Sequence, residues 1–179
     1  GNTYPPRHGE TRGACPGRKT LSAACGRLKI KKVKITTIRS LITRFLTKNR
    51  LFYSLVTECP NAKLLLYGSD EEGYEAKASA FKNLKRNENF FYPGLTRSPY
   101  DALQGGDVFV LPTWREGFGS SVIEAQALGL PVITSDAYGV CDASVPEKTG
   151  LRCKVDDVEG LYKCMKYYYE HPELRKVHG

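Results

Sequence analysis

Two glutamates, Glu116 and Glu124, flank a glycine- and serine-rich turn in the segment REGFGSSVIEAQALGLPVITSD, residues 115–136. The turn leads into a helix-like stretch that stops at Gly129 and is followed by an apolar β-branched run. The start of a helix offers free backbone N–H groups and a positive dipole end, so it can hold an anion such as a phosphate. A carboxylate can accept hydrogen bonds from vicinal hydroxyls. The spacing therefore indicates a ligand that carries both phosphate and hydroxyl groups.

Each residue of this turn has a role in such a site. Gly117 and Gly119 let the backbone approach a ligand closely, and Ser120 and Ser121 add hydroxyl donors. Glu116 can accept from a hydroxyl-rich group, and Glu124, one turn inside the helix, can reach a ribose diol. The same letters also permit a structural interpretation. Ser121 to Glu124 matches a capping box, and Glu116 could be a solvated loop acid.

The elements that position this turn follow an alternating pattern. Strands are predicted over residues 62–68, 89–94, 107–113, 131–135 and 149–155, and Leu64–Leu66 are expected to be buried on both faces. Helices are predicted to end near Cys59 and to cover 71–87, 98–106 (capped by Ser98), 120–128 and 157–176, the last as one or two helices. Alternation of this kind predicts a Rossmann-like α/β fold, a parallel sheet with helices on both faces.

The first fifty residues differ from the rest of the 179-residue chain. They carry a net charge of about +12, whereas residues 51–179 carry about −4, which together give +8. Such a break is typical of a tail or a separate module. We expect disorder over 1–18 and an atypical basic segment over 19–50. Residues 19–30 could hold a first strand, and residues 36–56 place Ile38, Leu41 and Leu55 near helical spacing.

Composition excludes several classes of protein. No apolar run is long enough to span a membrane, and the first residues lack the apolar region of a signal peptide. A reducing compartment is therefore expected for the six cysteines. None of them form a C-x-x-C pair, which argues against a zinc or redox site. The three histidines lie near the two ends of the chain, away from the glutamates, which argues against a hydrolase triad.

The segment DVFVLPTWREGFGSSVIEAQALGLPVITSD resembles the E-x₇-E signature of group 1 retaining glycosyltransferases, as do PNAKLLLYGSDEEG, GLRCKVDDVEGLYKCM and HPELRK. The resemblance covers roughly residues 52–177 and is strongest to bacterial surface-polysaccharide enzymes. It implies a hexosyltransferase of the GT-B fold, with 51–179 as its donor-binding Rossmann-like domain. It also implies that Glu116 meets the donor sugar as the catalytic residue, that Gly117, Phe118, Gly119, Ser120 and Ser121 meet sugar and diphosphate, and that Glu124 binds the ribose.

The family also holds the diphosphate with an Arg and a Lys in a G-R-L-x-x-x-K-G motif. Here GRLKIKKV supplies Gly26, Arg27 and Lys32, but Val33 stands where the motif has glycine. The distance from Lys32 to PNAKLL is also longer than the family pattern. A shifted reading frame or an insertion before residue 50 would explain both departures and the charge break; one uninterrupted, family-like frame in the encoding DNA would contradict this.

The resemblance implies a nucleotide-sugar substrate, a cytoplasmic location and no obligatory metal or cofactor, because helix amides and cations can stabilise the leaving diphosphate. Asp157, in VDDVEG, is expected to be a helix cap. We also expect a fragment, with the N-terminal acceptor-binding domain missing and the chain inactive alone. The basic first segment is compatible with contact to an anionic membrane surface. Two alternatives stay open: a basic nucleic-acid- or membrane-surface-binding module, with few aromatic residues to stack on bases, and a nucleotide-binding domain of another class, such as an epimerase.

Overall fold

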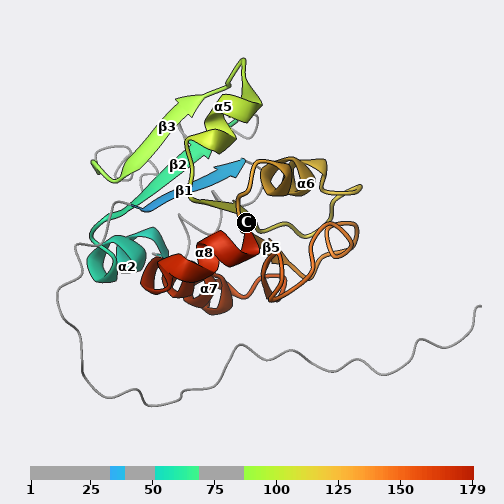
Figure 1. Ribbon diagram of the computed structural model, residues 1–179. Helices are drawn as coiled ribbons and strands as arrows, with labels where there is room; N and C mark the ends of the chain where they lie inside the picture. Colours follow the sequence, from blue (N-terminus) through green and yellow to red (C-terminus); the bar gives the residue numbers. More distant parts are fainter. Residues whose placement is uncertain (1–32, 39–50, 69–86) are drawn as a thin grey trace, which may run out of the picture.

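The computed structural model describes residues 33–38, 51–68 and 87–179, in which strands and helices alternate (Figure 1). The strands are β1 (Val33–Ile38), β2 (Ala62–Tyr67), β3 (Phe90–Gly94), β4 (Val108–Leu111), β5 (Val132–Ser135) and β6 (Gly150–Cys153). The helices are α2 (Leu51–Glu58), α5 (Pro99–Gln104), α6 (Ser120–Ala127), α7 (Val158–Glu170) and α8 (Pro172–His178). None of these helices has the length and apolar character needed to cross a bilayer.

All six strands join one sheet in which every neighbouring pair is parallel. The order across the sheet is β3-β2-β1-β4-β5-β6, so the chain moves outward from β1 to β3 and then returns to place β4 on the other side of β1. Ligands of such doubly wound sheets bind where the order reverses, outside the carboxyl ends of the strands. We call that side of the sheet the carboxyl edge. The reversal here lies between β1 and β4.

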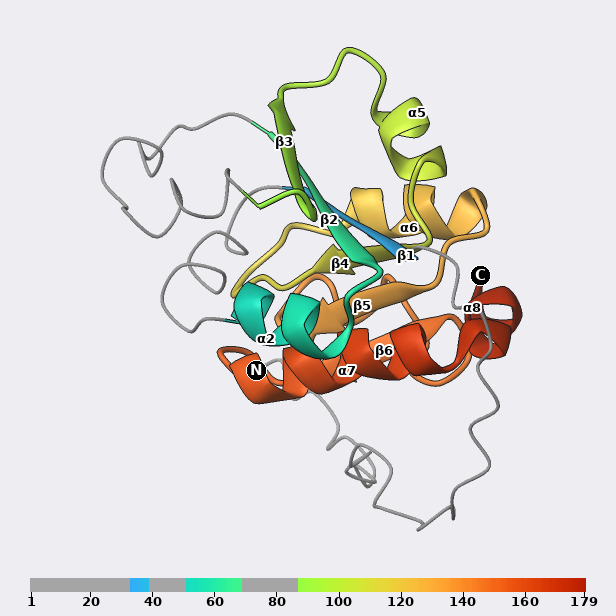
Figure 2. The same ribbon diagram turned by 90° about the vertical axis from the view of Figure 1, so that its left-hand side faces the viewer.

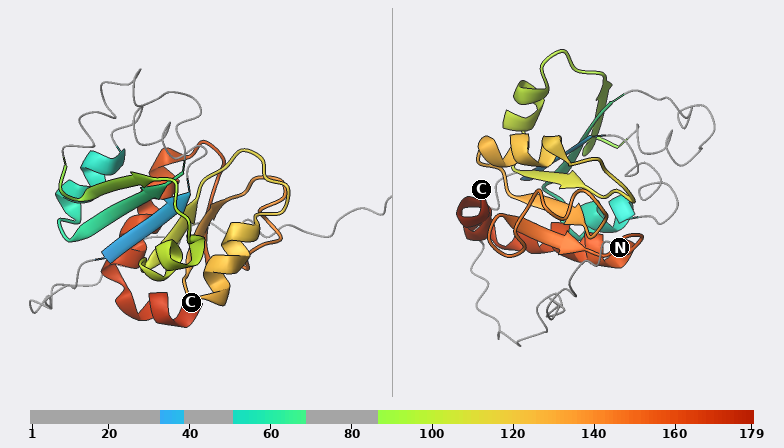
Figure 3. Two further views of the ribbon diagram at one scale, coloured as in Figure 1. Left: turned by 90° about the horizontal axis from the view of Figure 1, so that it is seen from above. Right: turned by 90° about the vertical axis from the view of Figure 1, so that its right-hand side faces the viewer.

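Helices cover both faces of the sheet (Figures 2 and 3). Each face has its own hydrophobic core. On one face α2 and α7 lie side by side, and Leu55 and Tyr168 pack with Leu64 and Leu66 of β2. On the other face α6 packs Val122 and Ala125 against β4 and β5. Each large apolar side chain removed from water stabilises the fold by ~1.5–3 kcal/mol. The two cores confirm the predicted α/β class.

The predicted strands after residue 51 are confirmed, as are the Ser98 cap of α5 and the Gly129 stop of α6. The closing region forms two helices, α7 and α8. The predictions for 1–18 and 19–30 fall outside the described residues, as does nearly all of the helix expected over 71–87.

Two expectations about elements are wrong. The helical spacing read from residue 36 fails at its start, because Thr36–Ile38 are the end of β1. The run VKITTI is rich in β-branched residues, whose stiff side chains fit a strand better than a helix. Strand β2 is also not fully buried on both faces: Leu64 and Leu66 are buried, whereas Leu65 is half-buried.

Candidate functional site

The predicted site residues lie in the loop between β4 and α6, at the carboxyl edge. Strand β4 ends at Leu111 and α6 begins at Ser120, so residues 112–119 form this connection, which we call the site loop. Because β4 is one of the two strands at the reversal, the loop lies where ligands of such sheets bind. The structure thus places Glu116, Gly117, Phe118 and Gly119 at the carboxyl edge.

The start of the site loop is fixed by a side chain from β5. The Ser135 hydroxyl accepts from the backbone N–H of Thr113 at 2.9 Å and donates to the carbonyl of the same residue at 2.5 Å. The Thr113 hydroxyl in turn donates to the Arg115 carbonyl at 3.1 Å. Thr113 and Ser135 are both buried. These hydrogen bonds fix the backbone conformation of the loop where it leaves the sheet.

Glu116 is held through its backbone by the loop that follows β5. Its N–H donates to the Tyr138 carbonyl at 3.1 Å, and Arg115 and Tyr138 form an isolated parallel bridge. Gly139 makes this approach possible: it has φ +87°, and a Cβ there would lie 1.9 Å from the Glu116 carbonyl oxygen. Sequence reasoning missed Gly139, because its role depends on Glu116, which lies far earlier in the chain.

Helix α6 begins without a side-chain cap. Its N-cap is Gly119, in the left-handed region at φ 71° and ψ 42°, so the helix's first amides have no partner from a capping side chain. The capping-box interpretation is therefore wrong, because Ser121 is the second residue of the helix rather than its cap. Gly119 is buried, and a Cβ there would lie 3.1 Å from the Val140 side chain. The uncapped start leaves donors that an anion can use.

The other predicted residues follow from this helix start. Ser120 is exposed and Ser121 half-buried. Glu124 is half-buried one turn further, so it shares a face with Ser120. Gly117 is exposed, with open space where a Cβ would stand. Phe118 is 59% exposed. The chain therefore presents an exposed ring, hydroxyls and two carboxylates around one uncapped helix start.

Two side chains that sequence reasoning missed brace this arrangement. The Gln126 amide donates to the Val122 carbonyl at 3.1 Å and to the Ala143 carbonyl at 2.7 Å, which ties α6 to the segment after β5. Arg152 of β6 donates to the carbonyls of Cys141 and Ser144 at 2.7 and 2.8 Å. Neither contact was predicted, because the Gln126 bond to Ala143 and the Arg152 bonds form only when the segment after β5 has folded back onto α6 and β6.

The loop after β6 begins the closing helices. The Asp157 carboxylate accepts from the Gly160 N–H at 2.8 Å and caps α7, as the sequence predicted. His178 is buried and its Nδ1 lies 2.9 Å from the Tyr168 hydroxyl, so this histidine has a structural partner. Among the described residues, no group of three His, Cys, Asp or Glu side chains could hold a metal ion. The prediction of metal-independent chemistry stays a prediction.

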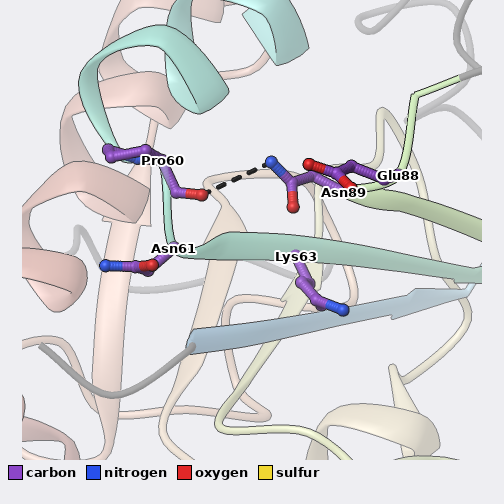
Figure 4. A pocket seen from close by; sticks show the side chains of 5 residues that line it. All are labelled: Pro60, Asn61, Lys63, Glu88 and Asn89. Atoms are coloured by element: carbon purple, nitrogen blue, oxygen red, sulfur yellow. Dashed lines mark hydrogen bonds between the residues drawn. The ribbon is translucent and has the colours of Figure 1, made fainter.

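A pocket of about 230 Å³ lies where β2 and β3 begin, at the edge of the sheet opposite the carboxyl edge (Figure 4). Its lining comes from the segments that precede β2 and β3 and from the start of β2: Pro60, Asn61, Lys63, Glu88 and Asn89. The Asn89 amide donates to the Pro60 carbonyl at 3.4 Å across it. The pocket is smaller than typical ligand sites and is at the amino ends of the strands. It therefore does not overlap the candidate site.

Arg27 and Lys32, predicted to hold a diphosphate, lie outside the described residues. Strand β1 begins at Val33, directly after Lys32, so in chain order the GRLKIKK motif precedes β1. Ligand-binding loops of open α/β sheets follow their strands. The assignment of Arg27 and Lys32 to the diphosphate therefore stays a prediction, and their position before β1 differs from that of a typical ligand-binding loop.

Comparison with known proteins places the chain in a family. The family model "Glycosyl transferases group 1" matches residues 46–179. The capsular polysaccharide biosynthesis glycosyltransferase CapM of Staphylococcus aureus is 34% identical over 128 residues, which are 72% of this chain and 34% of that protein. An N-acetylgalactosaminyltransferase of Campylobacter jejuni that acts on N,N'-diacetylbacillosaminyl-diphospho-undecaprenol, by its name, is 30% identical over 125 residues, 69% of this chain and 32% of that protein.

Solved structures show the same fold at low sequence identity. TarM superposes with a TM-score of 0.69 at 23% identity, over 83% of this chain and 30% of TarM. The C-terminal domain of LpcC, a group 1 family protein of Francisella tularensis, gives 0.64 at 16% identity, over 83% of this chain and 80% of that domain. Anabaena HepE in complex with UDP and glucose gives 0.67 at 15% identity, over 82% of this chain and 41% of HepE.

The described residues form one Rossmann-like half of a GT-B fold. The chain spans about a third of the length of the curated relatives that it matches first. The family match begins at residue 46, close to the break in charge near residue 50. The match covers most of the chain and includes the whole site loop and α6. The chain therefore belongs to the group 1 glycosyl transferase family.

Proposed function

We propose that this chain is the donor-binding domain of a retaining glycosyltransferase, which transfers a hexose from a nucleotide sugar to a saccharide or lipid-linked acceptor in polysaccharide biosynthesis. The observation that carries the proposal is the position of Glu116 and Glu124 on either side of an uncapped helix start at the reversal of the sheet. The names of the relatives, which include a capsular polysaccharide enzyme, support the reaction class. HepE, whose fold is similar, was crystallised with UDP and with UDP-glucose, which supports the donor.

Each group in the site has a place in this reaction. The first amides of α6 and the hydroxyls of Ser120 and Ser121 hold the diphosphate, where negative charge grows as the bond to the sugar breaks. Glu124 accepts from the ribose diol, and Glu116 meets the sugar. Gly117 leaves open space for the ligand. The sugar passes to an acceptor hydroxyl, and the nucleoside diphosphate is released.

The remaining proposals concern partners and location. Helix amides and cationic side chains can stabilise the diphosphate without a metal ion, so we propose no obligatory cofactor. The acceptor would be presented by another domain of the whole protein. A cytoplasmic site of action, with peripheral contact to an anionic membrane surface through the basic first segment, fits a lipid-linked acceptor.

The rival functions have little support in the chain. A dinucleotide enzyme such as an epimerase would carry a G-x-G-x-x-G turn after the first strand of the sheet. Residues 39–50, which follow β1, contain no glycine. A nucleic-acid-binding module would rest on residues 1–50, most of which the structure does not describe.

Titration calorimetry with uridine, guanosine and adenosine diphosphates tests the proposal. We expect one of them to bind with micromolar-to-millimolar affinity, roughly −8 to −4 kcal/mol. Each titration is run with magnesium and with a chelator, and equal affinity in both is expected because no metal is required. The melting transition of the same sample shows that the protein is folded. Absence of binding by all three to folded protein would contradict the proposal.

A further inference from the structure

A tryptophan in the site loop is bonded to a strained residue of a distant loop. The Trp114 indole Nε1 donates to Asp156 Oδ1 at 2.6 Å across 42 positions of the sequence. Trp114 lies two residues before Glu116, and Asp156 lies in the turn between β6 and α7. We call this pair the indole clamp. It joins the loops that follow β4 and β6, the same two loops that border the loop after β5.

Asp156 has an unfavourable backbone conformation at this contact. Its φ is 61°, and among the described residues only Glu147 is another non-glycine residue with positive φ. Asp tolerates the left-handed region better than most residues, but glycine would adopt it without strain. Strain of this kind persists where the surroundings over-determine it, and it gathers at functional sites.

The clamp completes the fixing of the site loop. Ser135 holds Thr113 at the start of the loop, and the Tyr138 carbonyl holds the N–H of Glu116. Trp114 lies between Thr113 and Glu116 in the loop, and its side chain is held by the hydrogen bond to Asp156. The Asp136 carboxylate accepts from the Val155 N–H at 2.7 Å, which fixes the Asp156 turn to the loop after β5. The three loops that follow β4, β5 and β6 are therefore joined to one another around Glu116.

We propose that Asp156 is a positioning residue for the donor site, which acts through Trp114 to hold the Glu116 segment against the sugar. The proposal rests on the proposed function. Asp156 is exposed and Trp114 is half-buried. Water competes for a hydrogen bond between such groups, so the bond adds little net stability. The bond instead fixes the path of the site loop. This matters because a small displacement of a group that binds substrate weakens the contacts of that group.

Asp156→Gly separates positioning from stability. The change relieves the backbone strain but removes the acceptor, so the protein should melt at the same temperature or higher. The extra affinity for a nucleotide sugar over its nucleoside diphosphate should nevertheless fall roughly tenfold. Asp156→Asn keeps both an acceptor oxygen and tolerance of the left-handed region, so it should retain the wild-type increment.

Glu147→Gly is the matched control. Glu147 has the same φ of 61° but precedes β6, so it lies toward the amino ends of the strands. Relief of strain there should raise the melting temperature without any change in the affinity for either ligand.

Trp114 provides a readout that needs no ligand, because it is the only tryptophan of the chain. In Asp156→Gly its emission should move to longer wavelength and acrylamide should quench it more strongly, whereas Asp156→Asn and Glu147→Gly should match wild type. An unchanged sugar increment in Asp156→Gly, with wild type binding normally, would overturn the clamp. Failure of wild type to bind any nucleotide sugar would instead contradict the proposed function, and the emission would still show whether Asp156 holds the indole.

Discussion

Glu116 and Glu124 are proposed to contact different parts of the donor, and this predicts different losses on substitution. Glu124 sits within α6, where it is proposed to bind the ribose, so Glu124→Ala should weaken nucleoside diphosphate binding by about 1.5–3 kcal/mol. Glu116 is proposed to face the sugar, so Glu116→Ala should leave the diphosphate affinity nearly unchanged and reduce the increment for the nucleotide sugar. Calorimetry with both ligands on both variants measures the two effects.

The uncapped start of α6 sharpens this test. With Gly119 as the N-cap, Glu124 has no capping role, so Glu124→Ala should leave the melting temperature nearly unchanged. A lower melting temperature with unaltered affinity would restore the capping interpretation. If neither glutamate alters either affinity, the carboxylates serve only the turn and the helix.

Gly139 carries a prediction about the backbone beside Glu116. In Gly139→Ala a methyl group would meet the Glu116 carbonyl at 1.9 Å in addition to the strain of φ +87°. We expect a loss of stability of ~2–4 kcal/mol and a weaker sugar increment, because Glu116 must move. Gly129→Ala is the control: its φ is +75°, but a Cβ would meet nothing within 4 Å, so strain alone should cost about 1 kcal/mol. Urea unfolding of both variants measures the difference, and equal losses would show that the close approach is unimportant.

At the scale of elements, a buried thiol where α2 packs against α7 predicts that the stability of the fold depends on pH. Cys59 follows α2 and is fully buried, and burial raises the pKa of its thiol from 9.0 to about 11. The folded pKa is the higher one, so stability is intact below pH 9 and falls as the pH rises from 9 to 11, where only the unfolded thiol ionises. The loss should be on the order of 1 kcal/mol by pH 10 and ~2–3 kcal/mol by pH 11.

Above pH 10 two tyrosines of α7 add to this loss. Burial is the largest cause that raises the pKa of both Tyr162 and Tyr168, so each phenol also resists ionisation in the folded state. Cys59→Ala therefore isolates the thiol between pH 9 and 10: it should lower stability at pH 7 through the lost side chain, but flatten the slope in this window. Urea unfolding at pH 7, 9 and 10 checks it. An unchanged slope in the variant would assign the alkaline loss to other groups.

Elements with a local signal could be predicted from the sequence, whereas contacts set by distant neighbours could not. The runs VFVL and VITS are buried at every position, and their apolar β-branched character marked β4 and β5 as strands. Strand β1 was missed because Ile38 also fits a helical spacing. In the site, Glu116 and the start of α6 could be predicted from the local sequence. Ser135 and Gly139 could not, because their roles depend on residues 22 or more positions away.

At the scale of the whole molecule, the fold accounts for binding of the donor but not for the complete transfer reaction. The described residues form one half of a GT-B fold, and the relatives are about three times as long as the part that matches. Every donor contact that is proposed for a described residue lies on the carboxyl edge of this one sheet. Nothing in the described residues is assigned to the acceptor. Binding of the donor is therefore expected of this chain, and positioning of an acceptor hydroxyl is not.

We accordingly predict that the purified 179-residue chain binds a nucleoside diphosphate but does not transfer sugar. Binding at a hundred times the dissociation constant should raise the free energy of unfolding by ~2.7 kcal/mol, which a shift in melting temperature detects. Transfer requires the acceptor to be held near the sugar, and such positioning can account for ~7–11 kcal/mol of a reaction barrier. Release of nucleoside diphosphate is measured with and without an added saccharide acceptor, and Glu116→Ala serves as the control for slow hydrolysis of the donor. Acceptor-dependent release that Glu116→Ala abolishes would show that this domain catalyses transfer alone, and the assignment of the acceptor to another domain would then be wrong.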